Sequence, residues 1–222
     1  MLEGLKSIRI LSDFNERQLN LINENCTPIS YENGALIFLE NEESKELYLV
    51  ESGIIKIFKT SLEGKELILY FVTPGDTINE APLATHEHNY FSAQALGPVG
   101  VFRISKDKFR EIVYNEKTLW TKLIDIVSRR LRKTLDLLGD FAFKKVTMRV
   151  AKTILEQFGE NEDTNLNRRI SKQEIAAMVG TSREVVHRSL RDLEENSLIK
   201  IDRHQIIIRN IDRLKEVADI GL

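Results

Sequence analysis

The chain has 222 residues, with 42% hydrophobic and 30% charged residues and a formal net charge of −2. These values are typical of a soluble globular protein with one large or two ordinary domains. They exclude a protein that coats nucleic acid with its whole surface, although a local binding site remains compatible with them. No apolar run reaches the roughly 20 residues of a membrane span, and the first residues do not form a signal peptide. We therefore expect a cytoplasmic protein without membrane contact.

Cys26 is the single cysteine of the chain. One thiol cannot form an internal disulfide, and this chain cannot supply the four cysteines of an iron–sulfur cluster. We expect a partly buried thiol, and an intermolecular redox disulfide is the alternative.

The first 27 residues predict one or two short helices. Ser12 and Asp13 can cap a helix in "FNERQLNLI", with Phe14, Leu19 and Ile22 on its apolar face.

From about Pro28 to Ile104, short runs rich in Ile, Leu, Val, Phe and Tyr alternate with turn residues at short intervals. Many short strands with regular turn signals predict an antiparallel sandwich or barrel. "SLEGKE" predicts a hairpin tip between two of the strands. We expect residues 1–104 to form one domain, a β-roll with N-terminal helices.

Residues 105–138 contain no glycine or proline and predict a long helix. An apolar stripe of this length is unusual for a globular helix and fits a dimer seam, and a helix packed only on its own β-roll is the alternative. Gly139 and Asp140 are expected to end the helix, with a hinge at about 138–141 and a further domain at 139–222. The stripe comprises Leu119, Leu123, Ile126, Val127, Arg130, Leu131, Thr134 and Leu138.

The segment "ISKQEIAAMVGTSREVVHRSLRDLEE" has the pattern of a helix-turn-helix. Ser171 and Glu174 predict a capping box at the start of the first helix, and Thr181 and Glu184 predict another at the start of the second. Gly180 lies between the helices and can adopt the positive φ of a tight turn.

The second helix of this pair divides into two faces when its residues are placed at about 100° intervals. Arg183, Glu184, His187 and Arg188 share the polar face, and the opposite face is apolar. An arginine can donate two hydrogen bonds to guanine, and a glutamate can accept one from cytosine. We expect Arg183, Glu184 and Arg188 to contact bases in the major groove. Solvated surface residues, with Glu184 serving its cap, are the alternative.

The segment "SLIKIDRHQIIIRN" predicts a β-hairpin wing, whose tip commonly lies near the phosphate backbone. Residues 141–222 carry 15 basic and 13 acidic residues, whereas residues 1–140 carry 17 basic and 21 acidic ones. The excess of basic residues therefore lies in the C-terminal part of the sequence, which also contains the helix-turn-helix. Candidate backbone contacts, which position a protein without recognising sequence, are Arg169, Lys172, Thr181, Ser182, His187 and Arg203.

With these parts, the chain resembles the CRP/FNR family of bacterial transcription regulators. The resemblance is dense in "RRLRKTLDLLGDFAFKKVTMRVAKTIL" and in the helix-turn-helix segment, and weaker in "GKELILYFVTPGDTINE". It implies an α+β protein with an N-terminal antiparallel, jelly-roll-like β-roll, a long dimerisation helix and a C-terminal winged helix-turn-helix. The family pattern R-E-x-x-x-R is matched by Arg183, Glu184 and Arg188, which implies a homodimer on a TGTGA-like inverted repeat in double-stranded DNA.

The resemblance also implies allosteric control by a small effector and activation of transcription through RNA polymerase. Members that bind cyclic nucleotides have Gly-Glu-Leu followed by Arg-Ser, but this chain has Asn79, Glu80 and Ala81, and then Asn89 and Tyr90. No Lys or Arg occurs from residue 66 to residue 102. A buried phosphate without a cation is costly, so we expect an effector other than cyclic AMP.

The long helix adds two residues to this expected effector pocket. Thr134 can reach a nucleobase, but Leu135 stands where a serine is usual for cyclic AMP. A neutral or weakly acidic organic molecule in an apolar pocket is the expected ligand. The predicted pocket residues are Asn79, Glu80, Ala81, Asn89, Tyr90, Thr134 and Leu135.

His86 and His88 form an HxH pair next to this segment. No carboxylate follows at the spacing of a cupin metal motif, so a metal enzyme of that class is not expected. Either histidine is a weak candidate for a haem ligand, so a haem-based gas or redox sensor is one alternative. The other alternative is that both histidines are solvated loop residues without a ligand. The sequence contains no catalytic constellation, so we expect no enzyme. A regulatory subunit that binds an effector but no DNA is the least favoured alternative.

Overall fold

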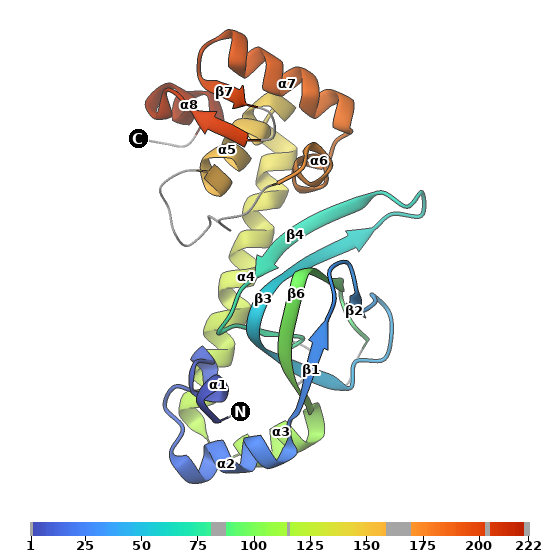
Figure 1. Ribbon diagram of the computed structural model, residues 1–222, viewed down its shortest axis with the longest axis vertical. Helices are drawn as coiled ribbons and strands as arrows, with labels where there is room; N and C mark the ends of the chain where they lie inside the picture. Colours follow the sequence, from blue (N-terminus) through green and yellow to red (C-terminus); the bar gives the residue numbers. More distant parts are fainter. Residues whose placement is uncertain (1, 81–87, 115, 159–169, 203–204, 220–222) are drawn as a thin grey trace. The chain divides into compact units, whose positions relative to one another are not determined.

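The computed structural model describes residues 2–80, 88–114, 116–158, 170–202 and 205–219. The chain divides into two compact units, Met1–Lys59 with Leu69–Thr134, and Thr60–Ile68 with Leu135–Leu222. An antiparallel sheet, a long helix and a C-terminal helix-turn-helix follow one another along the chain (Figure 1). This is the predicted α+β fold.

The sheet of the first unit has the strand order β1-β6-β3-β4. Strands β1, β2 and β3 each pair antiparallel with β6, and β5 pairs antiparallel with β3. Ser61 and Lys65 close the tip between β3 and β4, as "SLEGKE" predicts, with a backbone hydrogen bond of 2.8 Å. The strands are β1 Thr27–Tyr31, β2 Leu36–Phe38, β3 Glu46–Thr60, β4 Glu66–Val72, β5 Thr77–Ile78 and β6 Ser92–Ser105.

Two apolar cores stabilise the first unit. One lies inside the β-roll and contains Val50, Ile57 and Val101. The other lies where helices cover the opposite faces of β3 and β6, and it contains Leu49 and Phe102. The helices at this second core include α1 Leu2–Lys6, the 3-10 helix η1 Arg9–Leu11, α2 Glu16–Asn25, α3 Lys106–Val113 and the first part of α4 Lys117–Phe143.

The predicted cap at Ser12 and Asp13 is wrong, because α2 is capped by Asn15. The Gln18 backbone N–H donates to Asn15 Oδ1 at 3.0 Å, and the Asn15 N–H donates to Gln18 Oε1 at 2.8 Å. Cys26 directly follows this helix and is buried, and burial raises the pKa of its thiol to about 12.

Residues 105–138 hold two helices, the capped helix that "SKDKFREIV" predicts, with Ser105 as its N-cap, and the long helix that follows it. The long helix therefore does not begin at residue 105. Helix α3 ends at Val113, and α4 runs from Lys117 to Phe143. Gly139 and Asp140 do not end α4, because a single glycine costs a helix only about 1 kcal/mol. The Lys144 backbone N–H also donates to Asp140 O at 3.0 Å and continues the helical pattern past the glycine.

The predicted apolar stripe on α4 consists of a buried part and an exposed part. Leu119 and Leu123 are 1% and 6% exposed, and Ile126 packs against the same core. Leu119 and Leu123 are therefore covered by their own unit, whereas Ile126 is partly buried, and the dimer seam stays a prediction for the remaining residues of the stripe. Val127 and Leu131 from the same prediction are exposed. The exposed apolar residues of α4 are Ile124, Val127, Leu131, Leu135 and Leu138.

The second unit contains the helix-turn-helix and a two-stranded antiparallel sheet. Its core joins α5 to α7 and α8 through residues such as Ile154, Leu190 and Leu214. The elements are α5 Val146–Phe158, α6 Lys172–Val179, α7 Arg183–Glu195, β7 Ile199–Asp202, β8 Gln205–Ile208 and α8 Ile211–Ala218.

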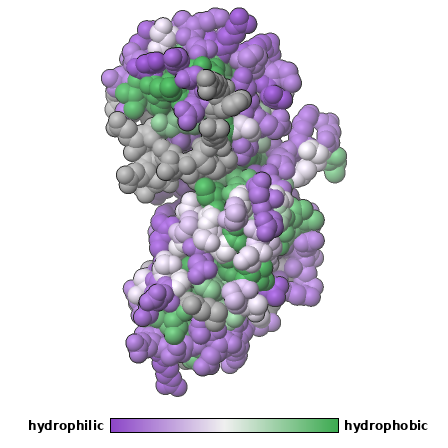
Figure 2. Space-filling view, in the orientation of Figure 1, coloured by the Kyte–Doolittle hydropathy of each residue, from purple (hydrophilic) through white to green (hydrophobic). Residues whose placement is uncertain are grey.

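The surface is hydrophilic over much of both units, and hydrophobic residues gather on parts of the face in view (Figure 2). Leu62, at the tip between β3 and β4, is fully exposed. In the described part of the chain, no helix combines the length and apolar character needed to cross a membrane.

Candidate nucleic-acid interface and effector site

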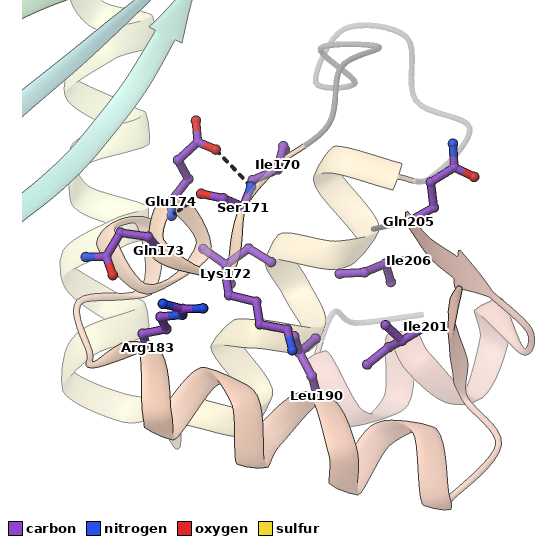
Figure 3. A pocket seen from close by; sticks show the side chains of 11 residues that line it. Ile170, Ser171, Lys172, Gln173, Glu174, Arg183, Leu190, Ile201, Gln205 and Ile206 are labelled. Carbon is purple, nitrogen blue, oxygen red and sulfur yellow. Dashed lines mark hydrogen bonds between the residues drawn. The ribbon is translucent and has the colours of Figure 1, made fainter. Parts of the chain in front are cut away.

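The turn between α6 and α7 forms as its sequence predicts. The Glu174 N–H donates to Ser171 Oγ at 3.1 Å, and the Ser171 N–H donates to Glu174 Oε2 at 2.8 Å (Figure 3). Gly180 ends α6 with φ +64°, in the left-handed region where a side chain is strained. A Cβ atom there would lie 2.9 Å from the ring of Phe141, so this close approach also requires glycine.

The cap of α7 is one residue later than predicted. Ser182, not Thr181, is the N-cap, and its Oγ accepts from the Val185 N–H at 3.4 Å. The second capping box, at Thr181 and Glu184, is therefore wrong. Glu184 lies in the first turn, where its own backbone N–H, the Ser182 hydroxyl and the charge of Arg183 lower the pKa of its carboxyl. A carboxylate at a helix N-terminus is also favoured by the helix dipole.

Helix α7 shows the two faces that the sequence predicts. Val186, Ser189, Leu190 and Leu193 are buried on one face. The small hydroxyl of Ser189 is paired with Thr147 Oγ1 at 3.3 Å. This packing fixes the rotation of α7, so the opposite face is presented to solvent. The exposed polar face carries Arg183, Glu184, His187 and Arg188.

An open groove of about 670 Å³ lies between the start of α6, Arg183 and Leu190 of α7, and the wing strands β7 and β8. Lys172, Arg183 and Gln205 contribute polar side chains, and Leu190 and Ile201 are among the apolar lining residues (Figure 3). Lys172 extends from α6 toward α7, and its Nζ lies 3.1 Å from Nδ1 of His187.

The structure describes only some of the other residues that are expected to contact the DNA backbone. Thr181 is half-buried and Ser182 is exposed, and both lie at the turn before α7. The predicted wing strands are present on both sides of the tip. Arg169 and Arg203 lie outside the described residues.

The β-roll contains a buried ion pair between Glu80, two residues after the end of β5, and Arg130 of α4. The Glu80 side chain is 2% exposed and accepts hydrogen bonds from Arg130 Nη1 and from the Thr77 hydroxyl. Arg130 also lies 5.3 Å from the ring centre of Tyr70. The segment from residue 66 to residue 102 contains no Lys or Arg, so it cannot itself supply this cation. The cation comes from a helix 50 residues later.

Burial and charge together set the ionisation of this cluster. Burial opposes the charge of Arg130, but Glu80 and Tyr70 outweigh it, so the pKa of Arg130 is raised. Burial raises the pKa of Tyr70 to about 12. The phenol of Tyr70 is therefore neutral at neutral pH, next to the contact between Arg130 and Glu80.

A second buried polar cluster adjoins the first along the chain. Asn79 Nδ2 donates to Asn89 Oδ1 at 3.0 Å and to Ser44 Oγ at 2.9 Å, and Asn79 itself has φ +74°. Asn89 Nδ2 donates to Leu39 O at 3.0 Å. Lys106 Nζ donates to Ser44 Oγ, and burial lowers the pKa of Lys106 to about 8.

The structure thus brings together Asn79, Glu80 and Asn89 of the predicted pocket. Tyr90 is 41% exposed and Leu135 is 57% exposed, so these two do not share the buried clusters. Thr134 is also exposed, and its hydroxyl donates to Arg130 O at 3.0 Å. Ala81 lies outside the described residues.

Sequence analysis missed Arg130 and Lys106 as members of these clusters. The helical spacing of Arg130 predicts a place in the dimer stripe, and Lys106 lies in the first turn of its helix without a distinguishing pattern. No local pattern marks either residue as a partner of a strand far away in the chain.

His88 is exposed and pairs with Glu43 through an isolated β-bridge. His86 lies outside the described residues. Among the residues that the structure describes, no group of three or more His, Cys, Asp or Glu side chains can hold a metal ion.

Comparison with known proteins matches both parts of the chain. Residues 28–116 match the cyclic nucleotide-binding domain, and residues 148–217 match the Crp-like helix-turn-helix domain. The chain is 31% identical over 189 residues to the cAMP-activated global transcriptional regulator CRP of Pasteurella multocida. The aligned residues cover 82% of this chain and 90% of that protein. It is 29% identical over 196 residues to the CRP-like cAMP-activated global transcriptional regulator of Mycobacterium tuberculosis, with coverage of 86% and 88%.

The fold is also shared with a solved structure. The c-di-GMP responsive global regulator CLP of Xanthomonas campestris has a TM-score of 0.77 and 20% identity, covering 87% of this chain and 99% of that one.

Proposed function

Because the chain belongs to the CRP/FNR family of transcription regulators, we propose that it is a homodimeric, sequence-specific activator that binds TGTGA-like inverted repeats. One observation carries the proposal. The first two turns of α7 expose Arg183, Glu184 and Arg188 on one face, while the other face is buried in the core of the unit. A helix fixed in this way presents its N-terminal side chains to the major groove.

Each of these side chains has a chemical partner on the base edges. Arg183 and Arg188 can each donate two hydrogen bonds to guanine O6 and N7, and Glu184 can accept one from cytosine N4. The lowered pKa of Glu184 keeps its carboxylate an acceptor well below neutral pH. Lys172, Thr181, Ser182, Arg169 and Arg203 are proposed to contact phosphates beside them.

The exposed stripe of α4 supports the homodimer. Ile124, Val127, Leu131, Thr134 and Leu138 follow one another at intervals of 3, 4, 3 and 4 residues, the repeat of a coiled-coil seam. Four of the five are apolar, and Leu131 is 58% exposed. A two-fold pair of such helices places two recognition helices on an inverted repeat. Activation through contact with RNA polymerase completes the proposal.

We further propose that the controlling effector is not cyclic AMP. The relatives named above are described as cAMP-activated or c-di-GMP responsive, so chains of this kind respond to different ligands. In this chain Arg130 is already paired with Glu80, and Asn89 donates to the backbone from one of the two positions where the resemblance expects Arg-Ser. Arg130 is therefore engaged by Glu80, and Asn89 carries no charge that could neutralise a cyclic phosphate.

A gel-shift titration with a TGTGA-N6-TCACA duplex and a scrambled duplex of the same composition tests the proposal. We expect one retarded complex that contains two chains, formed at least tenfold more tightly on the repeat. Equal affinity for both duplexes would overturn sequence-specific binding. The titration is repeated with cyclic AMP, and a large gain in affinity would overturn the proposal on the effector.

A further inference from the structure

Lys172 and His187 join the two helices of the helix-turn-helix through one hydrogen bond. Lys172 Nζ lies 3.1 Å from Nδ1 of His187. An ammonium group has three N–H donors and no acceptor, so Nδ1 must accept this bond. A ring whose Nδ1 accepts is neutral and carries its proton on Nε2. The contact therefore determines the tautomer of His187.

His187 belongs to the exposed face of α7 and lies between the two arginines that are proposed to contact bases. It follows Arg183 by four residues, or about 6 Å along the helix axis. Since base pairs rise by about 3.4 Å, this offset corresponds to roughly two base pairs. Lys172 occupies the Nδ1 side of the ring, so the Nε2–H is the group left to meet a ligand.

We propose that His187 contacts a base edge through Nε2–H and that Lys172 is the positioning residue that orients it. This inference rests on the proposed function, because it requires α7 to lie in the major groove. A single N–H donor is satisfied by guanine N7 or O6, adenine N7 or thymine O4, whereas cytosine presents an N–H donor there. His187 then selects against cytosine at one pair, and is not the phosphate contact that its sequence suggested.

The test is a binding selection with duplexes randomised across one half-site, followed by sequencing of the bound fraction. The full-length wild type is expected to disfavour cytosine at one pair next to those read by Arg183 and Arg188. The preference should be about fivefold, the size of one neutral hydrogen bond. His187→Ala should lose the preference at that pair and keep the others.

Two matched variants separate the two ring nitrogens. His187→Gln places an amide N–H near the position of Nε2 and should keep most of the preference. His187→Asn reaches only the position of Nδ1 and should lose it. An unchanged base profile in His187→Ala, with weaker binding to every duplex, would overturn the inference and assign His187 to the backbone.

A second measurement tests the positioning role of Lys172 without DNA. Two-bond nitrogen–proton spectra of the free protein should show His187 as the Nε2–H tautomer, and Lys172→Met should give a mixture of tautomers. A wild-type ring protonated on Nδ1 would overturn the inference even if the repeat is bound. Failure of the wild type to bind any duplex would overturn the proposed function, and this inference with it.

Discussion

Replacing Arg130 by methionine is expected to destabilise the first unit by about 3 kcal/mol. The Glu80 side chain is 2% exposed, so the variant leaves a buried carboxylate without its cation. Breaking a buried ion pair from one side typically costs about 3–5 kcal/mol. Arg130 is 20% exposed and Glu80 keeps the hydrogen bond from Thr77, which places the estimate at the lower end of that range.

The double variant Glu80→Met with Arg130→Met should recover most of the loss, because two apolar side chains of similar volume replace both charges. Arg129→Met is the matched control. Its pair with Asp125 is exposed on both sides, at 62% and 63%, so its loss should stay below about 0.5 kcal/mol.

The assay is urea unfolding followed by fluorescence of Trp120, the single tryptophan of the chain, which packs against the core of the first unit. A loss in Arg130→Met no larger than that in Arg129→Met would refute the reasoning. A double variant as unstable as Arg130→Met alone would refute it as well.

Three further predictions address other parts of the molecule. Burial lowers the pKa of Lys106 to about 8 from its usual 10.5, so between these values the unfolded chain binds more protons and the contribution of Lys106 to stability rises with pH. Urea unfolding should therefore show that the free energy of unfolding of the wild type, relative to that of Lys106→Met, rises from pH 7 to pH 10. A fall in this difference with pH would contradict the reasoning. Gly180→Ala should lower the stability of the second unit by roughly 1–2 kcal/mol, measured by thermal unfolding, because φ is +64° and the new Cβ meets the ring of Phe141; an unchanged melting temperature would count against the turn geometry. Leu131→Glu should convert the proposed dimer to a monomer in sedimentation analysis, whereas Arg132→Glu, next to it on α4, should not.

Local signals in the sequence predicted local structure well. The capping box at Ser171 and Glu174 and the positive φ of Gly180 depend on residues within a few positions of one another, and both are present. The two faces of α7 follow from helical periodicity alone. Where two neighbouring polar residues can each cap a helix, the sequence leaves an uncertainty of a residue or more, as at Asn15 and Ser182.

Long-range packing could not be predicted from periodicity. The apolar stripe of α4 shows that one side is apolar, but not that Leu119 lies against its own unit while Leu131 is exposed. The ion pair of Arg130 with Glu80 is a contact across 50 residues, and no spacing rule identifies it. The burial of Lys106 likewise depends on a long-range contact, because its Nζ donates to the backbone oxygen of Ser44.

The most direct test of base recognition by α7 compares Arg183→Ala with the wild type on two duplexes. One is the TGTGA inverted repeat, and the other has one guanine pair of each half-site exchanged for adenine–thymine. The wild type should prefer the first by about 5- to 150-fold per half-site, which corresponds to roughly 1–3 kcal/mol for a two-bond arginine contact. At the guanine pair that Arg183 contacts, the variant should bind both duplexes alike. If Arg183→Ala weakens both duplexes equally at every guanine tested and keeps the wild-type preference, α7 does not recognise bases as proposed.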